Sequence, residues 1–111
     1  MKLPANAVIA REKIIHYLLV RQARGDKSAF LQKAGYTNSN PDALISGLEA
    51  IRDEGEALWL NDNKYGRYYV VEGSLDGPFG VVLHVRTIWM TEALSGVTKL
   101  VTLTPIKSID R

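Results

Sequence analysis

The residues with the most obvious chemical potential lie in the segment HVRTIWM, residues 84–90. His84 and Arg86 are two positions apart, so in a β-strand both side chains point to one face while Trp89 points to the other. An imidazole can accept or donate a proton near neutral pH, and a guanidinium binds phosphate oxygens. The pair favours metal-free phosphodiester chemistry, provided that the surrounding elements bring further groups to the same face.

Helical periodicity dominates the first half of the chain, residues 1–55. An apolar stripe over residues 10–25 predicts the first helix, and Gly25 is expected to end it. A second helix is predicted over residues 26–36, with Asp26 at its N-cap.

The third helix has the clearest boundary signals. Asn40 and Pro41 are expected to begin it, and Gly55 to end it. Gly47 in its interior costs about 1 kcal/mol relative to alanine. We therefore predict that Gly47 marks a close helix contact.

The second half, residues 56–111, alternates polar and apolar side chains as β-strands do. Turns rich in Asn, Asp and Gly separate four predicted strands, at residues 57–60, 66–75, 81–90 and 97–106. The expected fold is a single α+β domain over residues 1–111. In it, three N-terminal helices pack on one face of a four-stranded antiparallel meander.

Matching the apolar side chains of neighbouring strands predicts two registers, with Leu75 opposite Val81 and Thr87 opposite Val101. Both choices gather polar side chains on the face turned away from the helices. In these registers Glu72 lies opposite His84, Arg86 opposite Thr102, His84 opposite Thr104, and Ile88 opposite Leu100.

The predicted catalytic residues are Glu72, His84, Arg86 and Thr102. Glu72 or His84 would take the proton of a ribose 2′-hydroxyl or protonate the leaving 5′-oxygen, and Arg86 would stabilise the phosphorane-like transition state. Tyr68 offers a stacking surface for a base, and Thr104 a further binding group.

Two other interpretations stay open. The same side chains could form a solvated ladder of charge pairs, each contributing about 0.2–1 kcal/mol and implying no chemistry. Alternatively, the domain could be a non-enzymatic interaction module that binds a protein partner through this face or through the edge of the last strand. The sequence also leaves the oligomeric state open.

Composition narrows the class of protein. The chain has 111 residues, a formal net charge of +2 and no cysteine, which excludes disulfides and thiolate metal sites. No stretch approaches the roughly 20 apolar residues that span a bilayer. The beginning of the sequence has no long apolar run of the signal-peptide type. We expect a cytoplasmic protein without a membrane partner.

No metal or cofactor is predicted. The two histidines, His16 and His84, are far apart in the sequence and lack the spacing of a zinc site. The segment NDNKYG superficially resembles a calcium loop, but Tyr65 occupies a ligand position, so a polar turn is the better interpretation.

Several stretches of the chain resemble an uncharacterised family of small bacterial domains. They are Leu3-Pro4-Ala5-Asn6-Ala7, KIIHYLL, AGY after Lys27 and Phe30, YGRYYVV, LDGPFG, Arg86-Thr87 with Trp89, and Leu100-Val101-Thr102. The resemblance covers nearly the whole chain and carries no assigned activity. It includes Lys27, which we take as a further candidate binding residue.

The order of elements is also similar to the layout of the barnase–EndoU–colicin–RelE group of metal-free ribonucleases found among bacterial toxins. That resemblance implies RNA as the substrate and an antitoxin or immunity protein as the partner. It also implies catalytic groups on the open sheet face, where alternation independently places His84, Arg86 and Thr102. The expected function is therefore a toxin-like module that binds or cleaves RNA without a metal.

Overall fold

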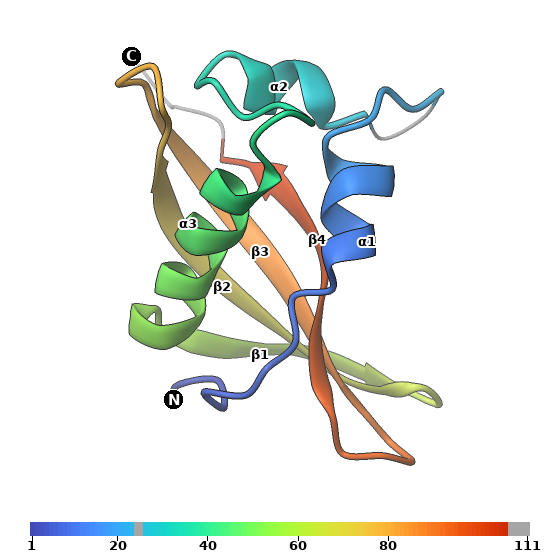
Figure 1. Ribbon diagram of the computed structural model, residues 1–111. Coiled ribbons are helices and arrows are strands. Elements are labelled where there is room, and N and C mark those ends of the chain that lie inside the picture. The colour runs from blue at the N-terminus through green and yellow to red at the C-terminus, as the bar shows by residue number, and fades with distance from the viewer. Residues whose placement is uncertain (24–25, 107–111) are drawn as a thin grey trace.

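The computed structural model describes residues 1–23 and 26–106 of the chain. Figure 1 shows helices on one face of a single twisted sheet. The elements in chain order are α1 (Arg11–Lys13), the π-helical turn η1 (Ile14–Leu18), α2 (Ser28–Gln32), α3 (Pro41–Glu54), β1 (Ala57–Asn63), β2 (Gly66–Asp76), β3 (Val82–Glu92) and β4 (Thr98–Pro105). The predicted α+β class with a four-stranded antiparallel sheet is confirmed.

The helical half differs from the prediction in its first two helices. The first ends at Leu18 instead of reaching residue 25, and Gly25 lies outside the described residues. The Gln22 side chain donates to the carbonyl oxygens of Tyr17 and Val20, at 3.3 and 3.2 Å, and so satisfies groups that a longer helix would have used. Such side-chain capping leaves no trace in the apolar periodicity.

The second helix is a short element of five residues. Asp26 does accept hydrogen bonds from the backbone N–H and the hydroxyl of Ser28, at 3.1 and 2.7 Å, but it lies one residue before the N-cap position. Among the described residues only α3 and the continuous α1–η1 stretch are longer. The predicted layer of three helices is therefore not confirmed.

Helix α3 forms where its boundary residues predicted, between Asn40 and Gly55. It packs on β2, and its Gly47 lies so close to Leu75 that an added Cβ would be 2.7 Å from the Leu75 Cδ2 atom. From the strand side, a Cβ on Gly73 would be 2.8 Å from Ile51. The predicted close contact at Gly47 is thus made with the sheet, and it brings α3 down onto the β2 backbone.

The strands follow one another in the order β1-β2-β3-β4, and each pair is antiparallel. In the β2–β3 pair Leu75 lies opposite Leu83, and not opposite Val81 as predicted. The register differs by two residues because Asp76 still pairs with Val82 before the turn begins. A shift of two leaves every side chain on its predicted face.

The β3–β4 register also differs from the prediction, since Thr87 lies opposite Leu103 and not opposite Val101. An irregularity follows, in which Ile88 pairs with Thr102 and Trp89 pairs with Leu100. A bulge of this kind reverses the alternation of one strand relative to its partner. Leu100 was predicted on the outer face opposite Ile88, but it is buried in the core.

Candidate functional site on the outer sheet face

The face of the sheet turned away from α3, here called the outer face, carries the predicted site in cross-strand rows. Alternation sends His84, Arg86 and Glu72 to this face, and all three are exposed, while Val85 and Trp89 on the other face are fully buried. The rows are Ser74–His84, Glu72–Arg86–Thr104, Val70–Ile88–Thr102 and Tyr68–Met90–Lys99. The strand phasing on which the site depends is therefore present in the structure.

Glu72 and Arg86 form an ion pair across β2 and β3. The Arg86 Nη2 and Nε atoms both donate to Glu72 Oε2, at 2.8 and 3.1 Å. The two side chains are 54% and 50% exposed, so the pair adds little to stability, about 0–1 kcal/mol. Its effect is to hold the guanidinium over the open face of the sheet.

His84 pairs with Ser74, a residue that the sequence analysis did not single out. The Ser74 Oγ and His84 Nδ1 atoms are 3.2 Å apart. The predicted partner Glu72 lies opposite Arg86 instead, because the register differs by two residues. Alternation alone places Ser74 on the outer face, so the available signal was its position two residues from Glu72.

Both outer-face threonines of β4 lie one row away from their predicted places, in the same direction. Thr104 lies opposite Arg86, and Thr102 lies one row further along, opposite Ile88. The structure therefore brings together Glu72, His84, Arg86 and Thr104, with Thr102 beside them. Lys27 lies at the beginning of α2, in the helical half, and does not belong to this group.

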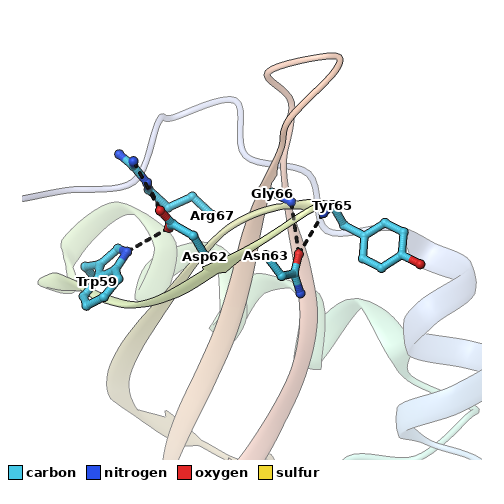
Figure 2. A network of polar contacts seen from close by, with 6 residues as sticks. All are labelled: Trp59, Asp62, Asn63, Tyr65, Gly66 and Arg67. Carbon is cyan, nitrogen blue, oxygen red and sulfur yellow. Dashed lines mark hydrogen bonds and ion pairs between the residues drawn. The ribbon is translucent and has the colours of Figure 1, made fainter.

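The β1–β2 hairpin carries a second polar network, shown in Figure 2, at the end of the sheet opposite to His84. The carboxylate of Asp62 accepts hydrogen bonds from Trp59 Nε1 at 2.9 Å and from Arg67 Nε at 3.1 Å. Both bonds lower the pKa of Asp62 below its usual value, and the bond from Trp59 has the larger effect. The network fixes the exposed indole of Trp59 beside the Arg67 guanidinium.

The turn of this hairpin is the segment that resembled a calcium loop. Asn63 Oδ1 accepts hydrogen bonds from the backbone N–H groups of Tyr65 and Gly66, at 2.8 and 3.3 Å. The Asn63 oxygen thus shapes a polar turn, as predicted. Within residues 1–23 and 26–106 no group of three or more His, Asp or Glu side chains is placed to hold a metal ion. Nor do these residues form a helix long and apolar enough to cross a membrane.

The family described as a domain of unknown function, DUF6883, matches residues 2–107. The chain belongs to this family. The prediction that the chain belongs to an uncharacterised domain family is therefore confirmed. No curated protein matches the DUF6883 chain.

A solved structure similar to this DUF6883 domain comes from a contact-dependent growth inhibition toxin–immunity protein complex of Klebsiella pneumoniae 342. The match has a TM-score of 0.69 and covers 94% of this chain and 97% of that chain, at 15% sequence identity. At this identity the likeness shows a shared fold.

Proposed function

We propose that this DUF6883 domain is a toxin-like module that cleaves RNA without a metal on its outer sheet face. The observation that supports the proposal most is the pairing of Glu72 with Arg86 beside the pairing of Ser74 with His84, on an open face. The shared fold with a chain of a toxin–immunity complex agrees with it. An RNA substrate would place its action in the cytoplasm.

Each group of the site has a role in the proposed reaction. The 2′-oxygen of a ribose attacks the adjacent phosphorus, the bond to the 5′-oxygen breaks, and a 2′,3′-cyclic phosphate forms. Glu72 takes the 2′-hydroxyl proton through lone pairs that Arg86 leaves free, and His84 protonates the departing 5′-oxygen. Diagonal neighbours on paired strands are roughly 7–8 Å apart, which leaves room for a phosphate between acid and base.

The neighbouring residues stabilise the transition state and hold His84 in place. Arg86, held by Glu72, stabilises the extra charge on the phosphorane oxygens, and Thr104 in the same row can donate a further hydrogen bond. Ser74 holds the imidazole of His84 through Nδ1, which leaves Nε2 directed to the substrate.

Purified protein mixed with transfer RNA or bulk RNA in a chelator tests the proposal. We expect cleavage to 2′,3′-cyclic ends, and His84→Ala or Arg86→Ala should slow it at least about a hundredfold. The matched control is His16→Ala, since His16 is exposed on η1 and does not belong to the outer face. Intact RNA after long incubation at micromolar protein, or unchanged cleavage by His84→Ala, would contradict the proposal.

A second candidate function is a non-enzymatic interaction module that binds a protein partner. It is favoured by β1, an edge strand on which Leu58, Trp59 and Leu60 are 58%, 63% and 46% exposed. An exposed apolar edge can receive a strand of another chain. Growth arrest on expression favours the toxin, whereas healthy growth with high yield favours the interaction module.

A further inference from the structure

A groove lies at the end of the outer face remote from His84 and extends past the β4 edge to α1. Two hollows of about 410 and 280 Å³ adjoin there and share Tyr68, Met90 and Lys99 as lining residues. Lys64 and Tyr65 line the first hollow, and Lys13 lines the second. These six residues are called the lysine–tyrosine groove below.

Positive charge prevails in the groove. Lys13, Lys64 and Lys99 contribute three cations, against one lining carboxylate, that of Glu92. Lys99 Nζ donates to Glu92 Oε2 at 2.7 Å, so the charge of Lys99 is balanced by that of Glu92. Lys64 Nζ lies 5.2 Å from the centre of the Tyr65 ring and remains at the surface, so the groove as a whole attracts a polyanion.

Aromatic rings stand among these cations. Tyr65 is 62% exposed, and its ring points away from Trp59 and Arg67 (Figure 2). Tyr68 lines both hollows and is paired with Met90 on β3, so its ring stands where the two hollows meet. Tyr65 is exposed and Tyr68 is half-buried. Rings that reach the surface among lysines are the combination by which proteins stack the bases of single strands and contact the phosphates between them.

We propose that the lysine–tyrosine groove binds single-stranded RNA and leads it to the Glu72–Arg86 pair. The inference rests on the proposed function and names its substrate class. Tyr68 and Glu72 lie on the same face of β2, about 13 Å apart along the strand, so a few nucleotides span both. Bases in a duplex are already stacked on one another, and therefore a single strand is the form that the tyrosines can hold.

Binding of a labelled single-stranded 2′-O-methyl oligoribonucleotide of about 12 nucleotides tests the inference. The methyl groups block attack by the 2′-oxygen, so the measurement is independent of cleavage. We expect Tyr68→Ala to weaken binding about tenfold, and Lys64→Glu with Lys99→Glu to weaken it at least as much and to reduce its salt dependence. The same sequence in a duplex should bind more weakly.

The charge control is Arg21→Glu with Lys33→Glu, which changes the net charge equally at exposed positions outside the groove. It should weaken binding far less than the groove variant. Wild-type protein that does not bind the single strand, or binding that survives both groove variants, would overturn the inference and leave the groove to a protein partner. Tight single-strand binding without any RNA cleavage would instead overturn the ribonuclease proposal and leave the groove standing.

Discussion

A hydroxyl in the middle of the core connects the two strands that carry most of the outer-face groups. Trp89 Nε1 donates to Thr87 Oγ1 at 2.8 Å, and Thr87 Oγ1 donates to the Val71 carbonyl oxygen at 2.7 Å. All three residues are fully buried. Because an unpaired buried N–H is costly, this threonine is what allows the largest core side chain to sit between β3 and the helices.

Replacing this threonine should destabilise the protein. Thr87→Val keeps the shape but leaves the Trp89 N–H without its acceptor, which costs about 1–3 kcal/mol. Thr87→Ser is the matched control, since it keeps the hydroxyl and loses only one methyl group, worth about 0.8 kcal/mol. Urea denaturation followed by circular dichroism measures both, and a valine variant at least as stable as the serine variant would contradict the hydrogen-bond argument.

At the scale of elements, the β1–β2 hairpin should respond to acid through Asp62. Its pKa is lowered in the fold by the bonds from Trp59 and Arg67. The contact therefore contributes to stability above the ordinary aspartate pKa and loses that contribution as the pH falls through the lowered value.

The indole N–H resonance of Trp59 in a proton NMR titration reports this change. We expect it to stay constant from neutral pH downward and to move only below the ordinary aspartate pKa. Asp62→Asn, which can still accept the indole hydrogen bond but cannot ionise, should give a flat profile. A transition at or above the ordinary value in the wild-type protein would show that the network does not form in solution.

Alternation along β2 and β3 was enough to predict which side chains share the outer face. The charged or titratable residues Glu72, His84 and Arg86 all have one parity, and the core residues Val71, Val85 and Trp89 all have the other. It could not predict which residues lie opposite one another, since a shift of two residues keeps every face. That is why Ser74 was missed as the partner of His84. The bulge at Val101 has no signal in the residue pattern, and it buried Leu100 against expectation.

Helix ends show the same contrast. Both ends of α3 were predictable because the residues at the ends themselves mark them: Asn40 and Pro41 at its beginning and Gly55 at its end. The first helix stops early because Gln22 reaches back to carbonyl oxygens, an arrangement that depends on the path of the following loop. The catalytic roles of Glu72, His84, Arg86 and Thr102, and the binding role of Thr104, remain predictions until RNA cleavage is measured.

In the whole molecule, the segment before α1 joins the two edges of the sheet. The Ala57 N–H of β1 donates to the Met1 carbonyl oxygen at 2.7 Å. Val8 pairs with β4, since its N–H donates to Thr98 O at 2.8 Å and its own carbonyl oxygen accepts from the Leu100 N–H at 2.9 Å. Leu3, between these points, is buried in the core. Part of the β4 edge is thereby covered, whereas Leu58 to Leu60 of β1 stay exposed.

Breaking the pairing between Val8 and β4 should loosen β4. Val8→Pro removes the N–H that bonds to Thr98 O, so we expect a loss of about 1 kcal/mol in the free energy of unfolding and faster hydrogen exchange at Leu100. Val8→Ala is the control, because the Val8 side chain is 42% exposed and alanine keeps the N–H. Equal urea midpoints and equal exchange rates in the two variants would mean that the segment only lies against β4, and that the cover of this edge contributes nothing to the stability of the sheet.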